Sequence, residues 1–229
     1  MLSHSRFISG LGPGAQMMRV TEEAKHYAQL RTAFGVTINN FGLVAAQLKT
    51  LDKYTERTTA ASFKLQREIL RKERSDRGES VFGSVLEEKQ HGFHVRLLIM
   101  LHKMVATTDA VMVSELAMSI FGGHGLMEDF SSHPRMYRDA VVLSGAWEGP
   151  KNLLLTRIFM DIQKSNEWYP TKELIRNLLR GSPEGIVKEL IERIDVLFAH
   201  GTLMGVDEKT IDVFLRVLVQ FMLQWISCY

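Results

Sequence analysis

Apolar residues recur at three- and four-residue spacing along almost the whole 229-residue chain, and Gly or Pro stands at the breaks between these segments. This spacing places apolar side chains on one face of a helix, whereas a half-buried strand needs alternation with a period of two, which is scarce here. The chain is therefore predicted to be all-α. Four helices are expected over residues 6–34, 43–74, 85–121 and 150–164, and their short or medium connections favour an antiparallel four-helix bundle.

The composition is that of a globular protein with a buried core, since 45% of the residues are apolar and 24% are charged. The formal net charge is +2, and no basic stripe is interleaved with aromatic residues, so neither nucleic acid nor a membrane is expected as a partner. The only cysteine is Cys228, which excludes an internal disulfide and is typical of a reducing compartment. The N-terminus has no signal-peptide pattern, and we expect a cytoplasmic protein.

The character of the chain changes after Ser165, where residues 166–170 predict a break. The last helix expected beyond this break has a broad apolar face, which favours docking against the bundle or against another subunit over membrane binding. We therefore divide the chain into a bundle of residues 1–164 and a helical extension of residues 165–229. The helices expected in the extension span residues 171–180, 182–200 and 207–226.

The stretch from Phe121 to Asn152 concentrates glycines and charged residues in a way that helices alone do not require. The paired Gly122 and Gly123 allow backbone N–H groups to approach a ligand closely. Farther on, Glu148 stands beside an aromatic residue in a turn of small residues, a setting that suits a general base. Two interpretations follow: a ligand loop followed by a base, or an interhelical connection whose glycines are caps and whose glutamate is solvated.

The order GGHG, MYRDA and WEGPKN in this stretch resembles the C-terminal domain of acyl-CoA dehydrogenases. That family has a GGxGY-like loop, a YRDA-like segment and a YEGT-like turn in the same order, and the resemblance covers residues 2–163. It implies an oxidoreductase that carries out FAD-dependent α,β-dehydrogenation of acyl-CoA thioesters. In the family, the glutamate of the last turn removes the α-proton, so the resemblance implies that Glu148 is the catalytic base.

Two motifs near the N-terminus extend the resemblance. The segment from Ser3 to Arg6 aligns with an aspartate-x-x-arginine segment that contacts CoA, although Ser3 replaces the acidic residue. Arg31 and Phe34 match an RxxFG motif that reaches the FAD of a neighbouring subunit. The resemblance thus implies substrate contacts at Ser3, Arg6, Trp147 and Gly149, and FAD contacts at Arg31, Phe34, Ser119, Gly122, Gly123 and Asn152.

Several polar residues of the family pattern are replaced in this chain. Each replacement removes a hydrogen bond worth about 0.5–1.5 kcal/mol, and together they weaken the expected affinity for FAD. A second interpretation is therefore a non-catalytic helical module for interaction or oligomerisation that has lost FAD. The replacing residues are Ala33, Gly42, Ser119, Pro150 and Asn152.

The resemblance also implies partners: an acyl-CoA substrate, an electron-transferring flavoprotein, and further copies of the chain in a homo-oligomer. The family's full chain has an N-terminal helical domain and a middle β-domain before the matching segment. The sequence leaves open the acyl chain length and whether the chain is a fragment, a subunit or a free-standing remnant. His91 and His94 have no third ligand at motif spacing, so no metal site is expected.

Overall fold

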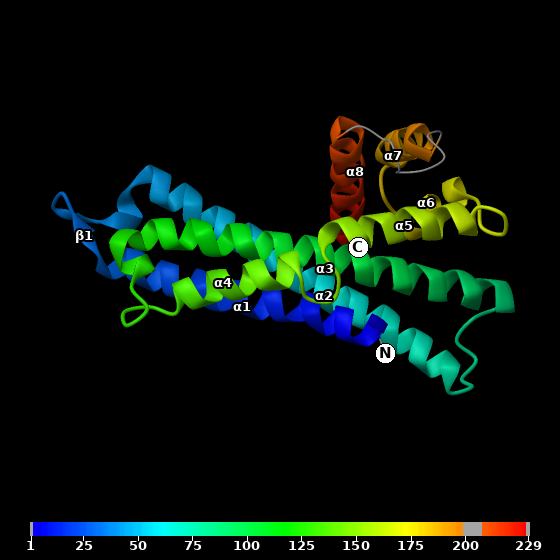
Figure 1. Ribbon diagram of the computed structural model, residues 1–229, viewed down its shortest axis with the longest axis horizontal. Coiled ribbons are helices and arrows are strands. Elements are labelled where there is room, and N and C mark those ends of the chain that lie inside the picture. The colour runs from blue at the N-terminus through cyan, green and yellow to red at the C-terminus, as the bar shows by residue number, and fades with distance from the viewer. Residues whose placement is uncertain (1, 199–207, 228–229) are drawn as a thin grey trace. The chain divides into compact units, whose positions relative to one another are not determined.

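Figure 1 shows the chain as a computed structural model that describes the backbone of residues 2–198 and 208–227. Side chains are described for residues 4–196 and 216–227. The structure is 82% helical, and its described part has eight α-helices and one hairpin of two-residue strands, so the all-α prediction is confirmed. The side chain of Ser3, all of Cys228 and the first residues of the apolar face predicted for the last helix lie outside the described residues.

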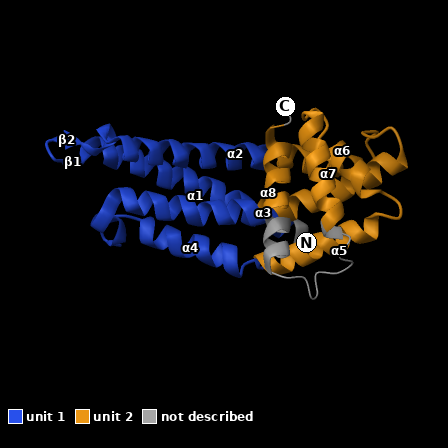
Figure 2. Cartoon of the chain, turned by 90° about the horizontal axis from the view of Figure 1, so that it is seen from above, with its two compact units in different colours: residues 1–63, 103–150 blue, residues 64–102, 151–229 orange. Residues whose placement is uncertain are grey.

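The chain forms two compact units, each built from separate stretches of sequence (Figure 2). Unit 1 contains residues 1–63 and 103–150, and unit 2 contains residues 64–102 and 151–229. The predicted division after residue 164 falls inside unit 2 and stays a prediction. The helices are α1 (Leu2–Leu30), α2 (Gly42–Asp76), α3 (Val85–Phe121), α4 (His133–Gly145), α5 (Lys151–Ser165), α6 (Thr171–Leu178), α7 (Glu184–Phe198) and α8 (Glu208–Ser227).

Unit 1 is a bundle of α1, α4 and parts of α2 and α3, and consecutive helices run in opposite directions (Figure 1). The predicted antiparallel four-helix bundle is confirmed. The interpretation of residues 121–152 as a connection between helices is wrong for residues 133–145, because these residues form α4. Pro134 stands in the first turn of α4, where its missing N–H is not needed. Met136 and Ala140 lie one turn apart and pack on the core of the unit. The predicted fourth helix, α5, belongs to unit 2.

The first helix begins and ends earlier than the expected range of residues 6–34, and it continues unbroken through Pro13. It ends at Leu30 because the residues that follow form a hairpin. Phe34 (φ 51°) and Gly35 (φ 86°) both have left-handed backbone angles, as a two-residue type I′ turn requires. The paired strands are β1 (Thr32–Ala33) and β2 (Val36–Thr37), which are followed by a 3-10 turn, η1 (Ile38–Asn40).

The apolar face of α1 forms much of the core of unit 1. Met17, Val20, Ala24 and Ala28 recur at helical spacing and are fully buried. Leu30, the last residue of the helix, is 82% exposed. The buried residues that complete this core are Ile38, Leu51, Ala110, Val113, Ala117, Ile120, Phe121 and Ala140.

The third helix is buried on all sides over its middle, since every residue from Leu97 to Thr107 is buried. By length and composition, α3 together with the turn after it qualifies as a membrane-spanning helix. However, 83% of its apolar window is buried inside the structure. A helix that is apolar all round is also what the core of a bundle requires, so its composition is weak evidence for a membrane span.

In unit 2, a buried hydrogen-bonded group joins α3 to α6. The ring of Tyr169 is fully buried, and its hydroxyl contacts His94 Nε2 (2.8 Å) and accepts a hydrogen bond from Asn177 Nδ2 (2.9 Å). Burial lowers the pKa of His94 to about 4, and it raises the pKa of Tyr169 to about 12. Both groups are therefore neutral at physiological pH.

The described part of the apolar face of α8 packs inside unit 2. Its members Leu218, Phe221, Met222 and Trp225 are all buried. Docking against the chain's own helices was one of the two predicted roles of this face. Because these side chains are already covered, they provide no argument for a contact with another subunit.

We predict that the free energy of unfolding of unit 2 falls as the pH falls from 6.5 to about 4. The folded state holds the pKa of His94 below its unfolded value, so folding favours the neutral imidazole. The stabilisation is complete above 6.5 and is lost as the pH falls through about 4. A pKa difference of this size between the unfolded and the folded state corresponds to about 3 kcal/mol of folding stability. Urea unfolding at several pH values, followed by tryptophan fluorescence, measures the loss.

His94→Gln keeps a polar partner for Tyr169 but removes the titration, so the pH dependence should flatten over this range. His26 is exposed, and His26→Gln serves as the control that should keep the parental dependence. If the pH dependence of unfolding is unchanged in the His94 variant, His94 is not the group that causes it.

Candidate functional site

The turn that carries Glu148 has a strained backbone. Glu148 has a φ of 56° and Gly149 has a φ of 101°. A left-handed conformation at a non-glycine residue costs of order 1–3 kcal/mol and persists only where the surroundings hold it. Two cations hold this turn: Arg6 Nε donates a hydrogen bond to the Glu148 carbonyl (3.2 Å), and Lys103 Nζ donates one to the Gly149 carbonyl (2.8 Å). Both carbonyl groups of the turn are therefore fixed by charged donors.

Lys103 is only 1% exposed, although lysine is rarely buried. Burial lowers the pKa of Lys103, the Arg6 cation lowers it further, and the Glu148 carboxylate opposes both effects. The three charged groups thus lie within electrostatic reach of one another. Sequence analysis missed Lys103, and the available signal was a lysine in the middle of the apolar segment of α3.

The predicted substrate residues gather in part around this turn. Arg6 and Gly149 belong to it through the hydrogen bonds above, and Trp147 adjoins it with a 58% exposed side chain. Ser3 lies on α1, one turn before Arg6, but its side chain is outside the described residues. The structure therefore brings Arg6, Glu148 and Gly149 together.

The glycines after α3 form a 3-10 turn, η2 (Gly122–Leu126), and they serve different purposes. Gly125 is structural, because a Cβ there would lie 2.8 Å from the Met118 carbonyl oxygen. Gly122 has a φ of 59° and follows the last residue of α3, as a helix-capping glycine does. A Cβ at Gly122 or Gly123 would meet no atom within 4 Å, so the backbone of both residues faces open space.

This open space is part of a cavity of about 320 Å³ in unit 1. Arg31, Gly122 and Gly123 line it together, so the structure brings three of the six predicted FAD residues to one place. Phe34 is 98% exposed at the tip of the hairpin and does not line the cavity. The other residues that line the cavity are Tyr27, Ile38, Ile120, Phe121 and His124.

Ser119 and Asn152 use their side chains on neighbouring residues. The hydroxyl of Ser119 donates to the Leu116 carbonyl (2.6 Å) and accepts a hydrogen bond from Gln47 Nε2 (3.3 Å). Asn152 lies in the first turn of α5, in unit 2, where its Oδ1 accepts a hydrogen bond from the Leu153 N–H (2.8 Å). Neither residue lines the cavity beside Gly122.

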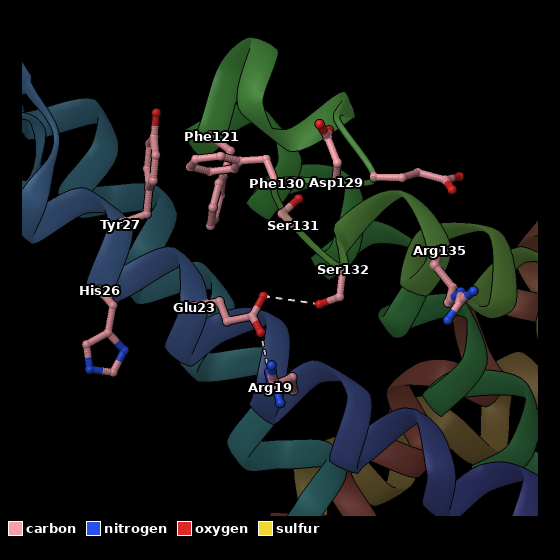
Figure 3. A pocket seen from close by; sticks show the side chains of 11 residues that line it. Arg19, Glu23, His26, Tyr27, Phe121, Asp129, Phe130, Ser131, Ser132 and Arg135 are labelled. Atoms are coloured by element: carbon pink, nitrogen blue, oxygen red, sulfur yellow. Dashed lines mark hydrogen bonds and ion pairs between the residues drawn. The ribbon is translucent and has the colours of Figure 1, made fainter.

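Sequence analysis also missed Tyr27, which forms a wall of the cavity. Its ring stacks on Phe121 at 4.2 Å between centroids, and its hydroxyl contacts His124 Nδ1 at 2.8 Å. Tyr27 and Phe121 also line a second cavity of about 600 Å³, which Figure 3 shows from close by. That cavity extends over Glu23, Ser132 and Arg135, so it opens on a polar surface formed by α1 and α4.

The glutamate turn contacts α1 near its start, and the glycine cavity begins just after the other end of this helix. Arg6, which contacts the turn, and Leu30, which precedes the cavity residue Arg31, are on one continuous helix. At a rise of ~1.5 Å per residue, these two positions are about 36 Å apart. A single small ligand therefore cannot contact both places on one chain.

No group of three or more potential metal ligands exists among the described side chains. His91 and His94, the pair considered from the sequence, have separate partners. His91 Nε2 contacts the Glu68 carboxylate (3.1 Å), and His94 contacts Tyr169.

The fold and the site define an all-helical domain that carries a held glutamate turn at one end and a cavity with a cation and open glycines at the other. The family described as acyl-CoA dehydrogenase, C-terminal domain, matches residues 1–162. The chain therefore belongs to the acyl-CoA dehydrogenase family, as its C-terminal helical domain. No curated protein matches the chain.

Solved structures share the fold over nearly the entire chain. The apo form of Bd2924 has a TM-score of 0.78 at 19% identity and covers 99% of this chain and 41% of its own. ACDH-11 of Caenorhabditis elegans, in complex with C11-CoA, has a TM-score of 0.73 at 21% identity and covers 100% of this chain and 38% of its own. An acyl-CoA dehydrogenase of Bacillus anthracis complexed with FAD has a TM-score of 0.67 at 17% identity, with coverages of 96% and 38%.

These likenesses have two consequences. Since they cover 96% or more of this chain, the helices after residue 162 belong to the shared fold and are not peculiar to this sequence. The chain spans about two fifths of the length of these solved chains. The likenesses therefore show the fold of this chain and do not show the activity of a whole protein.

We predict that Lys103→Met loosens the glutamate turn without unfolding the bundle. Methionine keeps an unbranched apolar stem in the buried position but leaves the Gly149 carbonyl without its donor. Loss of one such hydrogen bond should speed amide exchange of residues 146–150 by about tenfold. Hydrogen–deuterium exchange followed by mass spectrometry measures the change.

Lys53 is an exposed lysine on α2, and Lys53→Met is the matched control that should leave exchange in the turn unchanged. Equal exchange in the two variants would show that Lys103 does not hold the turn.

Proposed function

We propose that this chain is the C-terminal part of a flavoenzyme that oxidises acyl-CoA thioesters, with Glu148 as the base that takes the α-proton. The observation that carries the proposal is the held turn: a strained glutamate whose own backbone carbonyl is bound by Arg6, while Lys103 binds the carbonyl of the next residue, Gly149. Its position in the WEGPKN motif agrees with the family match. The C11-CoA bound to ACDH-11 supports an acyl-CoA as the substrate class.

In the proposed reaction, the Glu148 carboxylate accepts the α-proton while the α,β double bond forms. FAD, when bound, supplies the acceptor for the β-hydrogen, which leaves as hydride, and an electron-transferring flavoprotein would take the electrons onward. Arg6 and Lys103 fix the backbone of the turn before the substrate arrives, so the backbone that carries Glu148 needs little reorganisation during proton transfer. The proposal assigns Trp147 and Gly149 to the wall beside the reacting thioester, and Ser3 and Arg6 to the CoA side.

The glycine cavity fits the phosphate part of FAD. Arg31 supplies a cation, and the open backbone at Gly122 and Gly123 allows close approach of an anion. The FAD complexed with the relative from Bacillus anthracis supports this cofactor. We propose that Phe34, Ser119 and Asn152 also contact FAD. To do so, these side chains would have to break their present interactions or form additional ones.

The distance along α1 favours a homo-oligomer. The Glu148 turn and the Arg31 cavity of one chain are about 36 Å apart, so they serve different flavins if both are used. Each flavin would then take its base from one chain and its phosphate contacts from another, which requires at least two copies. A cytoplasmic location stays a prediction.

The second candidate function is a helical interaction module without FAD. The observation that favours it is the state of two of the residues predicted to contact FAD. Phe34 is almost fully exposed, and the hydroxyl of Ser119 is bound to Leu116 and Gln47 rather than turned to the cavity. Titration with FAD distinguishes the two functions, because only the first predicts saturable binding that Arg31→Gln weakens.

We expect Glu148→Gln to slow reduction of the flavin by acyl-CoA by about 10²–10⁴-fold, the usual cost of losing a general base. Substrate affinity should change little, because the amide nearly matches the carboxylate in shape. The measurement is stopped-flow bleaching of flavin absorbance in the full-length protein, or in this chain combined with the domains that complete the flavin site.

Glu128 is an exposed glutamate of the same unit, and Glu128→Gln is the control that should reduce the flavin at the parental rate. If the Glu148 variant also keeps the parental rate, another residue is the base.

We further expect the purified chain to associate. Light scattering at micromolar concentration should give a mass of at least twice the monomer's 26.1 kDa. A single species at the monomer mass would remove the argument that two chains share each flavin, while leaving the role of Glu148 to be judged by the kinetic test.

A further inference from the structure

A small cavity of about 180 Å³ lies within unit 2, and none of the residues assigned to the proposed reaction lines it. Its walls come from α2, α3 and α8, and from the end of α6 with the residues just after it. The polar residues that line it include Lys64, Glu68, Arg71, His91, Asn177 and Arg180.

Positive charge exceeds negative charge in this cavity. Three cations line it, against the single carboxylate of Glu68. That carboxylate is already engaged by His91, whose hydrogen bond lowers the pKa of Glu68 and so keeps it ionised. Arg180 forms no ion pair with any carboxylate of the described residues. Like charges around a small cavity repel one another, and a bound anion would offset this repulsion.

Each of the other two cations has an aromatic ring beside it. Lys64 Nζ lies 4.5 Å from the centre of the Trp225 ring and donates to the Trp225 carbonyl. The Arg71 guanidinium lies 4.8 Å from the centre of the Phe82 ring and forms a long ion pair of 3.9 Å with the Glu87 carboxylate. An aromatic face positions a cation without neutralising it.

His91 adds a buried polar atom that lacks a partner. The residue is 8% exposed, and its Nε2 contacts Glu68. Its Nδ1 is buried and has no hydrogen-bond partner among the described residues. A buried nitrogen left without a partner is unfavourable in the folded state.

We propose that this cavity binds a phosphate group, as inorganic phosphate or as the end of a small phosphomonoester. The volume decides the size: a water molecule occupies about 30 Å³, so a tetrahedral oxyanion fits with a few waters. Cofactor-sized ligands need about 300–1,000 Å³ and are too large. Monohydrogen phosphate also offers three acceptor oxygens to the cations.

The test measures binding of inorganic phosphate to the 229-residue chain by ³¹P NMR titration and by the rise of the thermal midpoint. Saturable binding is expected with phosphate, and weaker or no binding with chloride at equal ionic strength. Arg71→Gln and Arg180→Gln should each weaken phosphate binding about tenfold, because each removes a charge-assisted contact. Glycerol 3-phosphate distinguishes the source: tighter binding than phosphate indicates an esterified ligand, and weaker binding indicates the free anion.

Arg176→Gln is the matched control, since Arg176 is an exposed arginine on α6 that does not line the cavity. This variant should bind phosphate as the parent does, and circular dichroism checks that all variants are folded. The proposal is overturned if chloride stabilises the chain as much as phosphate does. It is equally overturned if a folded variant with both Arg71 and Arg180 replaced keeps the parental affinity.

Discussion

The burial of α3 is the constraint on which the rest of the structure depends. Eleven consecutive residues of α3, from Leu97 to Thr107, are all buried, so side chains of other segments have to cover this part of the helix on every side. A helix that is apolar on all sides cannot lie on the surface of a bundle. Both compact units accordingly contain a part of α3, together with parts of α2. The amphipathic faces of α1 and α4 follow from the same requirement, because each has only one side in the core.

Three charged or polar side chains of α3 show how this burial selects the segments that pack against the helix. His94, Lys103 and Asp109 each have a partner that is distant in the sequence, at separations of 75, 46 and 52 residues. Asp109 forms a two-pronged pair with Arg57, at 2.6 and 3.0 Å; burial raises the pKa of Asp109, and the arginine opposes that shift. Leaving such a group unsatisfied in the interior is costly, so each one specifies which segment packs against it.

Lys103 connects this structural principle to function. The same ammonium group that needs a partner inside the bundle binds the Gly149 carbonyl, next to the residue proposed as the base. Arg6 binds the Glu148 carbonyl from α1, 142 residues earlier in the chain. The strained conformation of the turn is thus maintained by two cations from α1 and α3, which hold its backbone carbonyls.

The sequence by itself determined the helical class, the family motifs and the candidate base, because these depend on the spacing of residues along the chain. It also located Arg31, Gly122 and Gly123, which the structure brings to one cavity. It did not reveal α4, whose short apolar pattern is flanked by glycines and lies inside a motif-rich stretch.

Only the tertiary structure decided which side chains surround these residues. The hairpin that exposes Phe34 depends on two positive φ angles, and the Tyr27–Phe121 wall joins α1 to the end of α3. The hold of Lys103 on the glutamate turn likewise joins segments far apart in sequence. Periodicity specifies which face of a helix is buried, but the partner of a buried group is set by packing between helices, which local sequence does not encode.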